Sequence, residues 1–141
     1  MTKKMNYKII AKYIKNLNFN INKPDIFLNL SKDITKYKFK IDIKSNSFRN
    51  NIVEIETTLS LTPKEIVDDK IIASASLSVL AELEKNLNKK ELEEIILIKV
   101  PSESYPELRK VFIYTFETSG FRDINIDEKV DFRKLYLSRK N

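Results

Sequence analysis

The sequence predicts an α+β fold in which a four-stranded antiparallel sheet is followed by helices on one of its sides. In four successive stretches up to Val79, apolar residues alternate with polar ones, the period of a strand with one buried face. Beyond that point the apolar residues recur every three or four positions, as on an amphipathic helix. Strands that precede helices in this way are typical of an antiparallel sheet with helices packed against one face.

Length and composition predict one soluble globular domain over residues 1–141. Apolar residues make up 42% of the chain and charged residues 33%, which favours neither disorder nor residence in a membrane. No run approaches the roughly 18 apolar residues of a membrane-spanning helix, and residues 1–4 do not lead into a secretory signal. We therefore expect a cytoplasmic protein without membrane insertion.

The residues needed for most enzyme chemistry are missing. The chain has no cysteine, no histidine and one glycine, which excludes thiolate and imidazole chemistry and glycine-rich phosphate loops. The carboxylate groupings, Asp68 with Asp69 and Glu91 with Glu93 and Glu94, lie in polar stretches and are interpreted as solvated surface. We predict no enzymatic activity, no metal site and no cofactor.

The first strand is predicted from Tyr7 to Ile21, with its apolar side chains at odd positions. Residues 22–35 break this period and are interpreted as a long loop. This loop is unusually apolar, with Ile26, Phe27, Leu28 and Leu30. Two interpretations remain open: these side chains pack on the chain's own core, or they face a ligand.

Three further strands follow. Residues 36–44 form the clearest one, and the polar residues Ser45, Asn46, Ser47, Asn50 and Asn51 are interpreted as its turn. Residues 53–61 form the next, which ends at Pro63. In the last, Ile71, Ala73, Ala75, Leu77 and Val79 point one way and Ser74, Ser76 and Ser78 the other, so one sheet face there is small and polar.

Three helices are predicted after the sheet. The first begins near Lys90 and ends near Pro101, and the second begins around Pro106 and ends at Gly120, a residue suited to a helix C-terminus. Asp131 is the expected N-cap of the third. The second carries a wide stripe that we interpret as an oligomer interface, consisting of Leu108, Val111, Phe112, Thr115 and Phe116, with Ser119 at its end.

A nucleic-acid-binding module is the rival of another class. The net charge is +6, and Tyr7, Tyr13, Phe39 and Phe48 are interleaved with lysine and arginine, as on a base-stacking surface. The two-residue period, however, places most of these rings on the aliphatic face and the lysines opposite. The core therefore accounts for the rings, and nucleic-acid binding is disfavoured.

Several motifs together resemble the SecB family of export chaperones. Tyr13 to Phe19 resembles the family's first-strand signature, and Lys23 to Phe27 its Pro-x-aliphatic-Phe entry to a crossover loop. Pro101 to Arg109 resembles the family's Pro-rich segment, with Val100 where the family has cysteine. Gly120-Phe121 and Val130 to Tyr136 resemble its closing motifs, and order and spacing agree over nearly the whole chain.

The resemblance implies an ATP-independent holdase that keeps unfolded preproteins competent for Sec-dependent export and assembles as a homotetramer, a dimer of dimers. It also implies that clients bind in hydrophobic grooves built from the crossover loop, a strand and the last helix. On this chain those positions are Ile26, Phe27, Leu28, Leu30, Phe39, Ile41, Ile43, Phe132 and Tyr136.

The chain departs from the family at the positions that would dock the translocase motor SecA. The family is usually acidic there, whereas this chain is basic and has Asn16, Asn20 and Ser74 on that expected sheet face. Docking to SecA therefore remains an open expectation. A SecB-like chaperone that guards the antitoxin of a toxin–antitoxin system is the alternative within the family.

Overall fold

The computed structural model describes residues 6–32, 37–63, 72–121 and 124–140 of the chain. Its elements in order are β1 (Tyr7–Asn20), α1 (Pro24–Lys32), β2 (Tyr37–Arg49), β3 (Ile52–Pro63), β4 (Ile72–Leu83), α2 (Lys89–Glu94), the π-helical turn η2 (Ile95–Lys99), α3 (Val100–Thr118) and α4 (Phe132–Lys140). The predicted residues Asp68, Asp69 and Ile71 lie outside the described residues. None of the helices described is long and apolar enough to cross a membrane.

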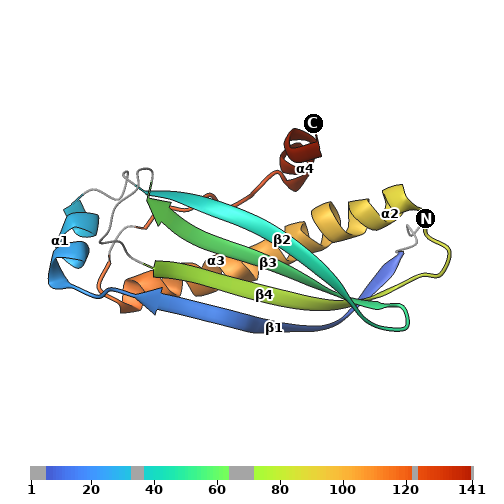
Figure 1. The fold of residues 1–141 in the computed structure, drawn as a ribbon, viewed down its shortest axis with the longest axis horizontal. Helices are drawn as coiled ribbons and strands as arrows, with labels where there is room; N and C mark the ends of the chain where they lie inside the picture. The colour runs from blue at the N-terminus through green and yellow to red at the C-terminus, as the bar shows by residue number, and fades with distance from the viewer. Residues whose placement is uncertain (1–5, 33–36, 64–71, 122–123, 141) are drawn as a thin grey trace.

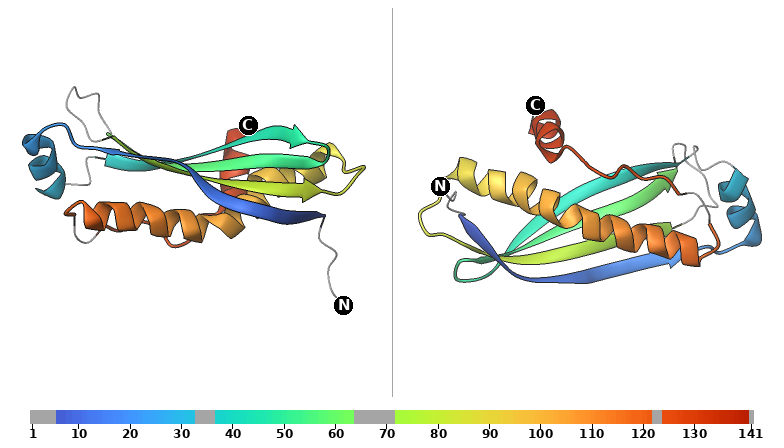
Figure 2. Two further views of the ribbon diagram at one scale, coloured as in Figure 1. Left: turned by 90° about the horizontal axis from the view of Figure 1, so that it is seen from below. Right: turned by 180° about the vertical axis from the view of Figure 1, so that it is seen from behind.

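The predicted fold class is confirmed. The four strands form one antiparallel sheet in the order β1-β4-β3-β2, so β1 and β2 are its edges (Figure 1). Figure 2 shows α3 running along one face of this sheet, while α4 lies beyond the β2 edge. The helix-covered face holds the core, and the opposite face is called the outer face below.

The constant period predicted for β1 is wrong, because two bulges reverse its phase. The pairing with β4 shifts between Ile9 and Ala11 and again between Ile14 and Asn16. A bulge adds one residue, and one residue exchanges the two faces of a strand. Tyr13 consequently lies on the outer face opposite Ser78, whereas Tyr7 is buried on the helix-covered face. The face separation used against nucleic-acid binding therefore fails at Tyr13.

The turn predicted at residues 45–51 is much shorter. β2 continues to Arg49 and pairs with β3 along its whole length, so the chain reverses only at Asn50 and Asn51. Asn50 has φ of 45°, a left-handed conformation that asparagine tolerates in turns. The polar residues here belong to the solvent-exposed end of a long hairpin.

The segment predicted as a loop contains a helix. Pro24, which is favoured in a first turn, opens α1, and Asp25 follows in that turn. Ile26 and Leu30, four residues apart and therefore on one face, are buried in the main core, while Leu28 is exposed. Phe27 is partly buried and also packs against this core, so packing on the chain itself accounts for three of the four apolar residues.

Pro101 does not end the preceding helix. Asn88 and Glu91 form a reciprocal capping box at the start of α2, and the chain then passes through η2 directly into α3. In a π-turn each backbone amide donates to the carbonyl five residues earlier instead of four. This shift lets the helix continue through Pro101, which has no backbone amide hydrogen to donate. Pro106 likewise lies inside α3, where Ser104 Oγ donates to the Val100 carbonyl at 2.9 Å.

The stripe predicted as an oligomer interface belongs to the chain's own core. Leu108, Phe112 and Phe116 are at most 2% exposed and pack against β3 and β4. Phe112 and Phe116 also contact each other, with ring centroids 5.1 Å apart. Val111 and Thr115 are only partly buried and lie at the margin of the stripe. One sheet is therefore sufficient to cover most of this face.

The predicted end of α3 at Gly120 and the predicted N-cap of α4 at Asp131 are confirmed. Gly120 has φ of +102°, and the amides of Gly120 and Phe121 donate to the carbonyls of Glu117 and Phe116, which is a Schellman motif. The Phe121 and Phe116 rings complete it with their hydrophobic contact. At the start of α4, the Lys134 amide donates to Asp131 Oδ1 at 3.0 Å, as expected for an N-cap.

Candidate functional site

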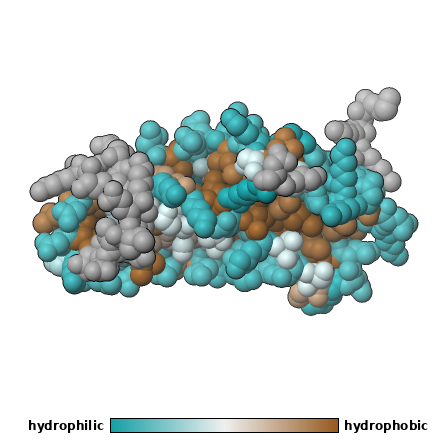
Figure 3. All heavy atoms as spheres, turned by 45° about the horizontal axis from the view of Figure 1, so that its top comes forward, coloured by the Kyte–Doolittle hydropathy of each residue, from teal (hydrophilic) through white to brown (hydrophobic). Residues whose placement is uncertain are grey.

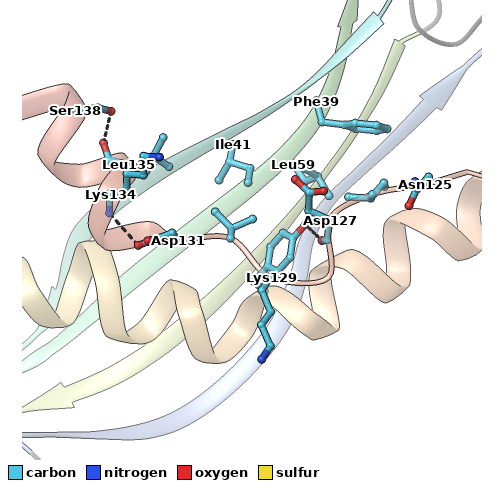
Figure 4. A pocket seen from close by; sticks show the side chains of 13 residues that line it. Phe39, Ile41, Leu59, Asn125, Asp127, Lys129, Asp131, Lys134, Leu135 and Ser138 are labelled. Carbon is cyan, nitrogen blue, oxygen red and sulfur yellow. Dashed lines mark hydrogen bonds between the residues drawn. The ribbon is translucent and has the colours of Figure 1, made fainter.

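An apolar groove lies beside the β2 edge, between the sheet and the final part of the chain. Its cavity measures about 500 Å³. The floor consists of Phe39 and Ile41 from β2 and Leu59 from β3, and Val130 and Leu135 close it from the other side (Figure 4). Figure 3 shows apolar surface gathered in a hollow between hydrophilic margins on this side of the molecule. We call this cavity the β2 groove.

Two hydrogen bonds from α3 hold the segment that roofs the β2 groove. Tyr105 donates its hydroxyl to the Asp127 carbonyl at 2.7 Å, and Arg109 Nε donates to the Ile126 carbonyl at 3.0 Å. Ile126 is buried in the main core. Burial also raises the pKa of the Tyr105 hydroxyl, which keeps it protonated as a donor. The connection to α4 is therefore fixed against the sheet although it has no regular secondary structure.

Polar contacts hold α4 as the wall of the β2 groove. Arg133 Nη1 donates to Glu94 Oε2 at 3.0 Å, and the Tyr136 hydroxyl donates to Glu93. Arg139 Nη2 donates to the Ile41 carbonyl at 2.7 Å, on the free edge of β2. The Arg133 guanidinium lowers the pKa of Glu94. Glu93 and Glu94 were predicted to be solvated surface, and the structure instead uses them to anchor α4.

The structure brings together only part of the predicted groove. Phe39 and Ile41 line the β2 groove, and Ile43 lies next to it with Tyr136 in the cluster under α4. Phe132 is buried against Tyr105, with ring centroids 6.0 Å apart, and so is part of the support. The α1 residues lie elsewhere, since Phe27 packs on Phe121 and Gly120 at the end of α3.

Sequence reasoning missed most of the polar rim. Asn125, Asp127 and Lys129 line the β2 groove from a segment that has no period in the sequence. The one available signal was Asp131, whose capping role fixes where α4 begins and hence where this segment must end. A second hollow, of about 630 Å³, lies beside Val53, Leu83 and Ile96 at the far end of the sheet. It is lined by none of the residues predicted for client binding, SecA docking or the oligomer interface.

Another exposed apolar surface lies on the β1 edge. Ile14 and Leu17 pair with Leu77 and Ala75, whose side chains face the helix, but α3 does not cover them. One side of α3 lies next to β1. Its residues are spaced by four, three and four positions, as on one face of a helix, and are Glu107, Val111, Tyr114 and Thr118. Lys12 Nζ contacts Glu107 at 2.9 Å, which places this flank beside β1. We call this surface the β1 flank.

The outer face carries the residues predicted to dock SecA. Asn16 pairs with Ser76, and Ser74 pairs with Asn18, while Asn20 continues the same phase. Asn16 and Asn20 are exposed, and Ser74 is partly buried. The three predicted residues thus share one face of the sheet, and their role there remains a prediction.

A solved structure shares the fold of this chain. A structure of the Mycobacterium tuberculosis SecB-like chaperone Rv1957, in complex with a peptide from the HigA1 antitoxin, matches this chain with a TM-score of 0.62. The match covers 86% of this chain and 90% of that one at 10% identity, so it concerns the fold. The architecture is that of a SecB-like chaperone.

Sequence comparison identifies the family. The model of the SecB family, described as preprotein translocase subunit SecB, matches residues 1–141. The putative protein-export protein SecB of Pelagibacter ubique is 35% identical over 137 residues, covering 96% of this chain and 98% of that protein. The protein-export protein SecB of Ehrlichia ruminantium is 26% identical, covering 94% and 88%. The chain belongs to the SecB family.

Proposed function

We propose that this chain is an ATP-independent holdase of protein export that binds unfolded segments of preproteins in the β2 groove. The open apolar groove is the observation that carries the proposal. The groove is lined mainly by apolar side chains and has no set of polar groups that would read one particular sequence. Such a groove suits many unfolded clients, because each of them offers scattered apolar residues. The relatives named for protein export favour this role over antitoxin guarding, which remains the alternative within the family.

The proposed assembly is a homotetramer in the cytoplasm, built through the β1 flank. An edge strand with uncovered apolar residues favours pairing with a second copy. Leu108, Phe112 and Phe116 no longer belong to the proposed interface, because they are buried within one chain. The β1 flank and the β2 groove lie at opposite edges of the sheet, so assembly would leave the groove accessible. SecA is the proposed recipient, docking on the outer face around Asn16, Asn20 and Ser74.

The proposed activity is tested by dilution of a denatured, slow-folding precursor into buffer without nucleotide, followed by light scattering. Near-stoichiometric protein should suppress aggregation. Leu135→Asp should abolish the suppression, because Leu135 lines the β2 groove and the substitution places a charge against the bound apolar segment.

Leu137→Asp is the matched control. Leu137 lies on the same helix, is 52% exposed and is not among the residues lining the β2 groove. It should hold clients like the parent protein. Equal activity of both variants would contradict the groove assignment. Failure of the parent protein, together with binding of DNA or RNA that weakens steeply with salt, would select the nucleic-acid rival.

A further inference from the structure

We propose that the end of the molecule formed by the β2–β3 hairpin and the start of α2 docks on membrane surfaces rich in anionic lipids. We call this region the hairpin end and define it by Phe48 and Arg49 of β2, Lys85 of the β4–α2 connection, and Lys89 and Lys90 of α2. The inference goes beyond the proposed holdase function, because the hairpin end shares no residue with the β2 groove or the β1 flank.

Phe48 lies exposed at the tip of the β2–β3 hairpin. The pairing of β2 with β3 shifts between Ser47 and Arg49, so Phe48 is the extra residue of a β-bulge, a feature that redirects a side chain. Phe48 is 51% exposed and belongs to none of the hydrophobic clusters found in the described parts of the chain. The fold gains no burial energy from this ring, which leaves it available to a partner.

A cation accompanies the exposed ring. The guanidinium carbon of Arg49 lies 4.3 Å from the centroid of the Phe48 ring. Such a pair suits the boundary between lipid headgroups and acyl chains, because the ring can contact apolar groups while the guanidinium stays with the phosphates. The tip of the hairpin therefore combines the two kinds of side chain that a peripheral membrane contact requires.

Three lysines lie at the same end of the molecule. Figure 1 shows the β2–β3 hairpin, the β4–α2 connection and the start of α2 together, opposite the end that carries α1. The hairpin and the connection are adjacent, since Asn50 and Lys85 both line the second hollow. Lys85, Lys89 and Lys90 are exposed, and the ion pairs between described residues include neither these lysines nor Arg49. Their charge is available to an anionic partner.

The carboxylates near these cations do not cancel their charge. Glu91 is engaged in the capping box, where it accepts from the Asn88 amide. Glu82 lies opposite Lys8 in the pairing of β1 with β4. Glu84 is the one other carboxylate between the end of β4 and α2. Cations therefore outnumber carboxylates at the hairpin end, which favours a negatively charged surface.

A membrane fits this surface better than a nucleic acid does. Single-stranded nucleic acids bind to rows of aromatic rings, on which successive bases stack. Phe48 is a single ring, and it stands at the tip of a hairpin, where an extended flat surface reaches it first. The lysines beside it would then lie within a Debye length of the lipid phosphates.

The test is co-sedimentation of the full-length protein with vesicles made of phosphatidylcholine alone or of an equimolar mixture with phosphatidylglycerol. The protein should bind the mixed vesicles and not the neutral ones, and added salt should weaken the binding. Lys89→Gln should weaken it about fivefold. Lys38→Gln is the matched control, since Lys38 is an exposed lysine at the opposite end of β2, and it should bind like the parent.

A second readout reports on the ring itself. The chain has no tryptophan, so Phe48→Trp introduces a single fluorescent reporter, whose emission should move to shorter wavelength with the mixed vesicles. Leu28→Trp is its control, because Leu28 is 52% exposed on α1 at the other end, and its emission should stay unchanged. Phe48→Ala should weaken vesicle binding and leave the suppression of aggregation intact, since Phe48 does not line the β2 groove.

Several results would overturn the inference. Equal losses in Lys89→Gln and Lys38→Gln would show that vesicles respond only to the net charge of the chain. Unchanged emission of Phe48→Trp would show that the ring stays in water. Tighter binding of a single-stranded oligonucleotide, lost in Phe48→Ala, would assign the hairpin end to nucleic acid instead. Each of these results leaves the holdase function standing, because the aggregation assay contains no lipid.

Discussion

At the scale of single residues, small side chains on β4 decide how the outer face is arranged. Ser78 on the inner strand β4 leaves room for Tyr13 of β1 to reach β3, where its hydroxyl contacts Glu54 at 2.5 Å. Lys15 donates to the same carboxylate at 3.1 Å. These two partners lower the pKa of Glu54, Tyr13 first, and the bond to Glu54 raises the pKa of Tyr13. Side chains of β1 are thus linked to Glu54 of β3 across Ser78 of β4 on the outer face.

Thr57→Val should stabilise the protein. The Thr57 hydroxyl is buried on the helix-covered face and has no hydrogen-bond partner among the described residues, so replacing it with a methyl group of similar size removes a desolvated polar group. We expect a gain of about 1 kcal/mol in the free energy of unfolding, measured by urea denaturation.

Thr58→Val, at the adjacent position, is the control, and we expect it to change the free energy of unfolding in the opposite direction. Thr58 Oγ1 and Ser76 Oγ are hydrogen-bonded at 2.7 Å on the outer face, and Ser76 is buried. Thr58→Val should therefore lower the free energy of unfolding by about 1 kcal/mol. If the two substitutions shift the denaturation midpoint in the same direction, the assignment of Thr57 as an unsatisfied group is wrong.

At the scale of elements, α4 is held by side chains rather than by a large buried area. Its nine residues form a short helix that would be marginal alone. Phe132 inserts beside Tyr105 and Ile98, and Arg133, Tyr136 and Arg139 supply the polar contacts. The wall of the β2 groove is therefore an element whose position depends on a few anchors.

Arg133→Ala should loosen α4 at pH 7. The Arg133 side chain is exposed and water screens its pair with Glu94, so we expect only about twofold faster amide exchange, confined to α4. Lys134→Ala is the control, since no ion pair of Lys134 is found among the described residues. An equal effect of both substitutions on exchange would show that the ion pair contributes nothing.

The pH dependence of this anchor follows from the lowered pKa of Glu94. A carboxyl whose pKa is lower in the folded state stabilises that state above its ordinary pKa. The contribution disappears as the pH falls through the lowered value. The difference between wild type and Arg133→Ala should accordingly be constant from pH 6 to pH 8 and vanish only in strong acid.

At the scale of the whole molecule, the two exposed apolar surfaces lie at opposite edges of one sheet. β1 and β2 are the edge strands, and α3 covers the strands between them. Arg139 already occupies part of the β2 edge, whereas Ile10, Ile14 and Leu17 leave the β1 edge apolar and uncovered. This asymmetry favours assembly at β1 and client binding at β2.

Leu17→Asp should reduce the mass of the assembly measured by light scattering after gel filtration. The side chain is 51% exposed in the single chain, so a carboxylate is tolerated in a monomer but not in a buried apolar interface. Leu28→Asp is the matched control, since Leu28 is 52% exposed on α1 and is not one of the residues of the β1 flank. Both variants should retain the far-ultraviolet circular dichroism of the parent. A monomeric parent protein, or identical masses of all three, would contradict the proposed interface.

The sequence by itself determined the fold class, the faces of β2, β3 and β4, the end of α3 and the start of α4. Some features depend only on residues close to one another in the sequence and can therefore be predicted from it. They are the alternation in residues 53–61, the left-handed residue Gly120 and the N-cap Asp131. Ordered motifs such as Val130 to Tyr136 also indicated the SecB family before any contact was known.

Only the tertiary structure decided which apolar residues are covered and which polar ones line the groove. Two bulges moved Tyr13 to the outer face, and the sheet buried Phe112 and Phe116 beneath α3, because register and packing depend on distant strands. Asp127 faces the groove because Tyr105 and Arg109, more than 15 residues earlier in the chain, fix its backbone and that of Ile126. Residues brought together across such separations leave no period in the sequence.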